Sequence, residues 1–445
     1  MRHARGGLID RGSARLSTEE NENEGHEDRG TRENVIGYRG APVPRMKILF
    51  CNYEYPPLGG GGGVVNAALA AELAKRHDVT VLTSRGPGLE PTEIVDGVRV
   101  VRVPVLFRRR RAVANFASML AYVGTGTLAG RRLLAKGQYE IVNTHFALPT
   151  GPVGAALARV GKVPNVLSVH GGDLFDPSKR SSAHRHAPLR AVVRYVALAA
   201  DAVVAQSEDT RDNLNRYYAP EVRPVIIPLG IAAPPRVAAS RASHDVRPDD
   251  VLLIAIGRLV ARKRFERLIA AVAMLDDPRV KLLLIGDGPK AAELREQAAR
   301  LGVASRVRFC GAVDETTKHE LLEIADIYVS TSDHEGFGLV FLEAMTHGLP
   351  IVCGDRGGQR DFLVDGASGY LVPPDDVGRV VERCRRLIDR ADERLAIGNA
   401  NRARARDFFI GRCAERYEEL FETVVREHRR RARLGIAGRV AEGTK

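Results

Sequence analysis

Short, uninterrupted apolar runs alternate with longer helix-like stretches along most of this chain. One set of runs extends from Lys47 to Gly230, and a second set extends from Val251 to Pro373. Strands that are apolar on both faces must be covered on both faces, as in parallel sheets between layers of helices. The pattern therefore predicts an α/β protein with two doubly wound, Rossmann-like domains that face a cleft. Ligands of such sheets bind at the carboxyl ends of the strands.

Changes in composition predict the domain boundaries. A stretch rich in Pro, Ala, Ser and Arg, residues 232–250, predicts a linker between an N-terminal domain, 46–231, and a C-terminal domain, 251–397. Residues 1–45 are polar, mixed in charge and without apolar periodicity, which predicts a disordered extension. The last residues, 426–445, are rich in arginine, which predicts a basic tail.

The sequence leaves two candidates for the true start of the chain, Met1 and Met46, because Met46 directly precedes the first apolar run. The arginines that follow Met1 lead into no apolar segment of the kind that a signal peptide requires. The five cysteines are scattered without a Cys-x-x-Cys pair. This spacing is typical of reduced thiols in a cytoplasmic protein.

The chain carries a formal net charge of +12 at pH 7, which favours phosphates, anionic lipid headgroups or nucleic acid as partners. Aromatic residues make up only 5% of the chain and show no RNA-stacking motif, so we predict no nucleic-acid partner. No Asp-x-Asp motif occurs. We therefore predict neither a metal ion nor a cofactor.

A run of glycines, Gly59–Gly63, follows the first apolar run and opens a helix-like stretch. Glycines let a phosphate or sugar approach the backbone, and a helix N-terminus favours anions. A dinucleotide site is an alternative, but its acidic residue is missing, because the second apolar run ends in Ser84 and Arg85. A flexible turn without a ligand is the other alternative.

Two segments of the second set combine cations with carboxylates. Arg258 and Lys263 follow an apolar run, and Glu335 and Glu343 lie on either side of a glycine-rich entry into a helix. Arginine and lysine can neutralise a diphosphate, and carboxylates accept hydrogen bonds from hydroxyl groups. The combination predicts a nucleotide-sugar site. A solvated basic helix face and two acidic residues near a helix start are the alternative.

These segments belong to a longer series of motifs: "MKILFCNYEYPPLGGGGGVV", "SVHGGD", "GRLVARKRFERLI", "LLLIGDGP", "RVRFCGAV" and "STSDHEGFGLVFLEAMTHGLPIVCGD". Their order and spacing resemble the retaining glycosyltransferases of family 4, which have the GT-B fold. The resemblance extends from Met46 into the 420s. It implies transfer of a sugar from a UDP- or GDP-sugar to an acceptor hydroxyl with retained anomeric configuration. It also implies a helix over 398–425 that crosses to the N-terminal domain.

The resemblance assigns roles to the matching residues. Arg258 and Lys263 would bind the donor diphosphate, Glu335 and His170 would lie beside the donor sugar, and Glu343 would hold the ribose. We expect Arg262 and Arg264 to point outward, and the role of Asp361 stays open because the family more often has glutamate there. The predicted set is catalytic Arg258, Lys263, Glu335 and His170; donor-binding Gly60, Gly61, Gly311, Val313, Gly336, Phe337, Gly338, Leu339 and Glu343; and acceptor-binding Asp173, Arg108 and Arg109.

Four consecutive arginines, Arg108–Arg111, precede a mildly apolar segment that contains Phe116, Met119, Leu120 and Tyr122. The segment is too polar for a membrane span. We expect peripheral attachment to an anionic membrane at its inner face, with a glycan or lipid-linked acceptor in cell-envelope synthesis. The alternative is a solvated basic helix that orients a soluble anionic acceptor.

Two other functions stay open at this point. A nucleotide-sugar epimerase of similar two-domain architecture would convert a sugar nucleotide without an acceptor. A non-catalytic nucleotide-sugar-binding protein would leave its ligand unchanged. The presence of both glutamates together with the Arg/Lys pair favours a transferase.

Overall fold

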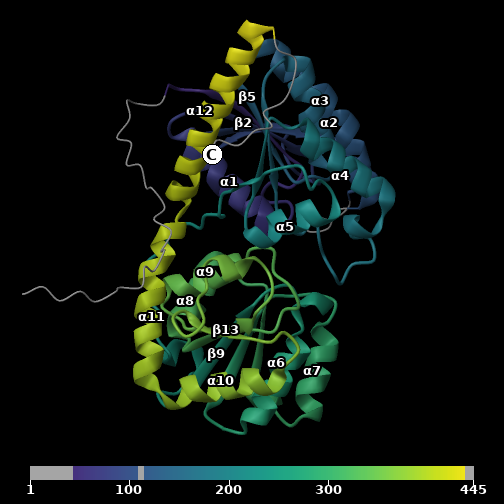
Figure 1. The fold of residues 1–445 in the computed structure, drawn as a ribbon. Coiled ribbons are helices and arrows are strands. Elements are labelled where there is room, and N and C mark those ends of the chain that lie inside the picture. Colours follow the sequence, from purple (N-terminus) through teal and green to yellow (C-terminus); the bar gives the residue numbers. More distant parts are fainter. Residues whose placement is uncertain (1–43, 109–114, 436–445) are drawn as a thin grey trace, which may run out of the picture. The chain divides into compact units, whose positions relative to one another are not determined.

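The computed structural model describes residues 44–108 and 115–435 (Figure 1). The chain divides into the units Met1–Pro44 and Arg45–Lys445, and every described helix and strand belongs to the second unit. The extension expected over 1–45 therefore lies almost wholly outside the described residues, as do residues 109–114 and 436–445.

The first half of the described chain forms an eight-stranded sheet with the order β3-β4-β2-β1-β5-β6-β7-β8. The strands are parallel except for the antiparallel pair β3 and β4. The strands are β1 Lys47–Asn52, β2 Asp78–Ser84, β3 Thr92–Val95, β4 Val98–Val103, β5 Ile141–His145, β6 Asn165–Val169, β7 Ala202–Ala205 and β8 Val225–Ile226. The helices are α1 Gly61–Ala74, α2 Phe116–Lys136, α3 Thr150–Gly161, α4 Ala187–Ala199 and α5 Glu208–Tyr217.

The second half forms a six-stranded parallel sheet with the order β11-β10-β9-β12-β13-β14. Its strands are β9 Val251–Ile256, β10 Val280–Ile285, β11 Val307–Gly311, β12 Ile327–Ser330, β13 Ile351–Gly354 and β14 Gly369–Val372. Its helices are α6 Phe265–Leu275, α7 Ala291–Arg300, α8 Glu315–Ile324, α9 Leu339–Thr346, α10 Val377–Asp389 and α11 Ala391–Ala405.

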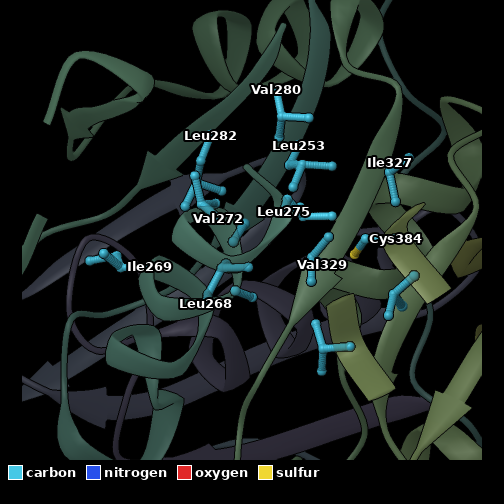
Figure 2. Packing of buried hydrophobic residues seen from close by; sticks show 14 of the residues in the cluster. Leu253, Leu268, Ile269, Val272, Leu275, Val280, Leu282, Ile327, Val329 and Cys384 are labelled. Atoms are coloured by element: carbon cyan, nitrogen blue, oxygen red, sulfur yellow. The ribbon is translucent and has the colours of Figure 1, made fainter. Parts of the chain in front are cut away.

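Strand β9 shows why the apolar runs become central strands. Successive side chains of a strand point to opposite faces of the sheet. Leu253 joins one core with residues of α6 and α10, including Leu268 and Cys384 (Figure 2). Leu252 and Ile254 join a second core on the other face. Burial of each such side chain stabilises the fold by about 1.5–3 kcal/mol, so both faces require a layer of helices. The predicted pair of doubly wound domains is confirmed.

The C-terminal helix differs from the expected 398–425. Helix α11 ends at Ala405, and a separate helix, α12, runs from Ile410 to Leu434. Helix α12 packs on α1 beside the N-terminal sheet (Figure 1), where Tyr417 Oη contacts Ser168 Oγ at 2.9 Å. The first part of the expected basic tail is therefore helical up to Leu434. Within the described residues, every helix is too short or too polar to span a bilayer.

Candidate active site

A cavity of about 730 Å³ lies between residues of the two halves. Its N-terminal wall comes from the start of α1 and from the loops after β5, β6 and β7, and its C-terminal wall comes from the loops after β9 and β12 and from helices α8 and α9. These are the carboxyl ends of parallel strands, where ligands of such sheets bind. The polar and charged residues on its wall include His170, Asp176, Lys179, Gln206, Arg262, Lys263, Glu315, Lys318, His319, His334, Glu335 and Glu343.

Glu335 and Lys263 form the centre of the charged wall. Lys263 Nζ lies 2.5 Å from Glu335 Oε1, and Arg262 Nη1 lies 3.3 Å from Glu335 Oε2. Glu335 is only 7% exposed. Burial alone would raise the pKa of this carboxyl, but Lys263 and Arg262 outweigh burial and lower the pKa to about 2. Glu335 is therefore ionised and can only accept hydrogen bonds.

The turn that follows β9 positions both cations. Arg262 and Lys263 lie on a 3₁₀ turn, Ala261–Lys263. A Cβ at Gly257 would lie 3.0 Å from Lys263 Cε, so glycine at the strand end leaves room for the lysine. Arg264 instead pairs with Asp333 at 3.0 Å, outside the residues that line the cavity. The expectation that Arg262 points outward is wrong, because it lines the cavity and contacts Glu335.

Arg258 does not join Arg262 and Lys263 in the cavity wall. It follows β9 after Gly257, but its side chain is exposed and does not belong to the residues that line the cavity in the described part of the chain. Gly311 and Val313 also lie outside this lining. Gly311 ends β11, where its carbonyl accepts a hydrogen bond from Gly286 N at 2.7 Å.

The loop into α9 supplies backbone groups to the cavity. Gly336, Phe337, Gly338 and Leu339 all line it. Gly338 precedes the helix with φ +94°, a conformation that glycine adopts without strain. The amides of a helix N-terminus favour negative charge. Gly60 and Gly61 line the cavity from the opposite side, at the start of α1.

Glu343 lies in the cavity wall on α9. Its Oε1 is 2.8 Å from Lys318 Nζ on α8. Burial raises the pKa of Glu343 despite the opposing effect of Lys318. Sequence reasoning missed Lys318, because its position on an unrelated helix gives no sign of the pairing with Glu343.

His170 lies at the end of β6 and is 9% exposed. Its Nε2 is 3.0 Å from His145 Nδ1, and His145 Nε2 is 2.9 Å from Asn143 Nδ2. Burial lowers the pKa of His170 to about 4, with Gln206 opposing this effect. His170 is therefore neutral at pH 7 and can hydrogen-bond a ligand without carrying a charge.

The structure places two of the expected acceptor residues outside the lining of the cavity. Asp173 does not line the cavity; its carboxylate accepts hydrogen bonds from Ala147 N at 2.6 Å and His170 N at 3.0 Å. Arg108 is buried and donates to Ser84 Oγ at 2.7 Å. Both residues therefore fix neighbouring segments. Arg109 lies outside the described residues.

The first turn of α5 joins the two halves beside the cavity. Ser207 Oγ donates to Gly336 O at 2.9 Å, and Glu208 N donates to Asp361 Oδ2 at 2.8 Å. Asp209 Oδ2 lies 2.8 Å from His334 Nε2. Asp361, whose role the sequence left open, thus contacts the start of a helix in the other half. These contacts hold the Glu335 loop against the N-terminal half.

Comparison with known proteins agrees with this architecture. Sucrose-phosphate synthase from Thermosynechococcus elongatus has a TM-score of 0.76 at 24% identity, over 86% of this chain and all of that one. Anabaena HepE in complex with UDP-glucose has a TM-score of 0.69 at 21% identity, over 85% of this chain and all of that one. The fold is therefore that of the GT-B glycosyltransferases.

Sequence comparison identifies the family. The model described as Glycosyltransferase Family 4 matches residues 59–233, and the model described as Glycosyl transferases group 1 matches residues 237–404. A glycogen synthase of Mycobacterium tuberculosis is 30% identical over 378 residues, which cover 81% of this chain and 90% of the relative. The chain belongs to the family 4 glycosyltransferases.

Proposed function

We propose that this protein is a retaining hexosyltransferase that uses a UDP- or GDP-sugar. The observation that carries the proposal is the group formed by Lys263, Arg262 and Glu335 in the cavity between the two halves. Two cations suit a diphosphate, and an ionised carboxylate suits the hydroxyl groups of a sugar. The solved complex of HepE with UDP-glucose is a fold relative that supports this class of donor.

In the proposed reaction, the bond between the anomeric carbon and the diphosphate breaks as the acceptor oxygen bonds to the same carbon. Lys263, Arg262 and the amides at the start of α9 stabilise the negative charge that develops on the departing diphosphate. Glu335 is held by two cations, so we assign it to sugar hydroxyls and not to nucleophilic attack. The departing phosphate takes the acceptor proton, and the acceptor approaches from the face that the phosphate leaves.

The test is a panel of UDP-, GDP- and ADP-hexoses incubated with the full chain, with slow hydrolysis as the readout. We expect one donor to be hydrolysed, and Lys263→Ala to abolish most of this activity. Conversion to an epimeric sugar nucleotide without hydrolysis would identify an epimerase. Binding without any turnover, with or without acceptor, would identify a binding protein and contradict the proposal.

We further propose a cytoplasmic enzyme that attaches to the inner face of an anionic membrane and acts on a lipid-linked or envelope glycan. Support comes from four large apolar side chains on either side of residues 109–114: Leu106, Phe107, Phe116 and Leu120 are 59%, 69%, 73% and 63% exposed. Such side chains suit a headgroup boundary. Tyr122, which we expected to contribute, is instead buried.

Co-sedimentation with liposomes tests the membrane proposal. We expect binding to vesicles that contain phosphatidylglycerol, weaker binding at high salt, and loss of binding in Phe107→Ser/Phe116→Ser. The matched control is Leu395→Ser, a change at an exposed apolar residue of α11. Equal recovery with neutral and anionic vesicles would contradict the proposal.

A further inference from the structure

Gln206 is a buried polar residue of the cavity wall to which the sequence analysis gave no role. It follows β7 directly, as His170 follows β6. The two strands are parallel neighbours in which Val169 pairs with Ala205, so His170 and Gln206 leave the sheet at the same level. Gln206 is 4% exposed, and both residues line the cavity.

Both residues present an unused polar atom. Among the described residues, neither Gln206 Oε1 nor His170 Nδ1 has a partner with hydrogen-bond geometry, although both atoms are buried. The two side chains lie close to each other, because Gln206 opposes the lowering of the pKa of His170. Buried polar groups in folded proteins are nearly always paired, and leaving them unpaired costs free energy. Two such atoms on one cavity wall therefore point to a polar ligand.

The hydrogen bonds that join Asn143, His145 and His170 determine which nitrogen of His170 carries the proton. Asn143 Nδ2 donates to His145 Nε2, so neutral His145 carries its proton on Nδ1. That proton is donated to His170 Nε2, which leaves the proton of neutral His170 on Nδ1. The wall thus offers one donor, His170 Nδ1–H, and one acceptor, Gln206 Oε1.

This pair of groups selects the chemistry of the ligand. A hydroxyl group can accept from His170 and donate to Gln206 at the same time. A phosphate oxygen without a proton satisfies only His170. The side-chain amide also lies close to two glycines, because Gln206 Nε2 would be 3.1 Å from a Cβ at Gly336 and 3.2 Å from one at Gly171. It therefore lies against the loop that carries Glu335.

We propose that Gln206 is a specificity-determining residue that accepts a hydrogen bond from a donor-sugar hydroxyl to which His170 Nδ1–H donates. This proposal rests on the proposed function and names one group of the donor that the site recognises. It distinguishes Gln206 from Lys263 and Arg262, which we assign to the diphosphate. Its consequence is that loss of Gln206 weakens recognition of the sugar and leaves recognition of the nucleotide intact.

The experiment compares the wild-type chain with Gln206→Met, which keeps the length of the side chain and removes the amide. The probes are UDP-glucose and its 3-, 4- and 6-deoxy analogues, or GDP-mannose and its deoxy analogues if that donor is turned over instead. We expect Gln206→Met to lower kcat/KM for the intact donor by about tenfold to hundredfold. The affinity for UDP or GDP alone should not change.

The deoxy analogues separate recognition from a structural role. One analogue should be a poor donor for the wild-type enzyme, and Gln206→Met should cause little further loss with that analogue. The matched control is Gln297→Met on α7, whose side chain donates to Glu266 O away from the cavity; it should behave as the wild type. Equal losses with every analogue, or weaker binding of UDP or GDP, would overturn the proposal.

Failure of the proposal and failure of the proposed function give different results. If the wild-type chain neither binds nor hydrolyses any UDP- or GDP-hexose of the panel, the proposed function fails and this inference fails with it. If the wild-type chain turns over a donor and Gln206→Met matches it on all analogues, only the role of Gln206 is wrong.

Discussion

Lys263 Nζ lies 2.5 Å from Glu335 Oε1, although the two residues come from loops that follow different strands of the C-terminal sheet. Strands β9 and β12 are parallel neighbours, so the loops after them meet at the same edge. Without a ligand, Lys263 and Glu335 neutralise each other's charge in the cavity wall. With a donor bound, the lysine would contact the diphosphate and the carboxylate would contact the sugar, so the pairing holds both side chains ready for the substrate.

The first prediction concerns the acid stability of this pair. The pKa of Glu335 falls from its usual 4.5 to about 2 in the folded chain. The stabilisation is therefore fully present above pH 4.5 and is lost as the pH falls towards 2. A shift of this size corresponds to roughly 3 kcal/mol. We expect the free energy of unfolding of Glu335→Gln to change less than that of the wild type between pH 5 and pH 2.5.

Urea unfolding followed by circular dichroism across this pH range measures the difference. Glu293→Gln provides the control, because Glu293 forms an exposed ion pair with Lys290 on the surface of α7. Exposed ion pairs contribute little to stability, so this variant should follow the wild-type pH dependence. Parallel curves for wild type and Glu335→Gln would show that Glu335 is not held by its cations.

The second prediction concerns the leaving group. Lys263→Ala removes a charge that we place at the departing diphosphate, and loss of one such group typically lowers turnover by about 10²–10³. Arg258→Ala should also lower turnover if Arg258 binds the diphosphate, without a change in melting temperature, because its side chain is exposed. Steady-state kinetics and thermal melts measure both effects. Lys290→Ala is the control, and near-normal turnover in Lys263→Ala would contradict the assignment.

The sequence predicted the two sheets because their strands are continuous apolar runs. It did not predict the end of α11, because a tertiary contact ends that helix. Ile231 N donates to Phe408 O at 2.9 Å, and Ile410 N donates to Ile231 O at 2.8 Å. These bonds join the chain after the N-terminal domain to the segment between α11 and α12. No local propensity at 398–425 indicates such a contact.

Local sequence patterns also limited the prediction of the site residues. Lys263, Glu335 and Glu343 were predicted because each lies next to a strand end or a glycine-rich turn. The motifs around these residues also resemble those of the family 4 glycosyltransferases. Gln206 gave no such signal, since a single polar residue after a strand has no local pattern. Its importance comes from the register of β6 with β7, which places it beside His170. Arg262 was misassigned because a run of basic residues does not show which side chain turns inward.

The third prediction concerns α12. Phe421 is fully buried in the core that also contains Ile48 and Phe50 of β1. Replacement by alanine should destabilise the protein by about 3–5 kcal/mol, as is typical for a buried phenylalanine. Leu434→Ala, at the exposed end of the same helix, should have little effect. Denaturant unfolding measures both variants, and a small effect of Phe421→Ala would show that α12 is dispensable for the N-terminal core.

The last prediction concerns metal ions. We place Lys263 and Arg262 where a divalent cation would otherwise neutralise the departing diphosphate, so the reaction should need no added metal. Turnover should be unchanged after dialysis against EDTA and should not increase with Mg²⁺ or Mn²⁺. In Lys263→Ala, where part of the positive charge is lost, added Mg²⁺ should restore little activity, because the described residues include no group of three metal-ligating side chains. Loss of wild-type activity with EDTA and its recovery with Mg²⁺ or Mn²⁺ would overturn this assignment of the cations.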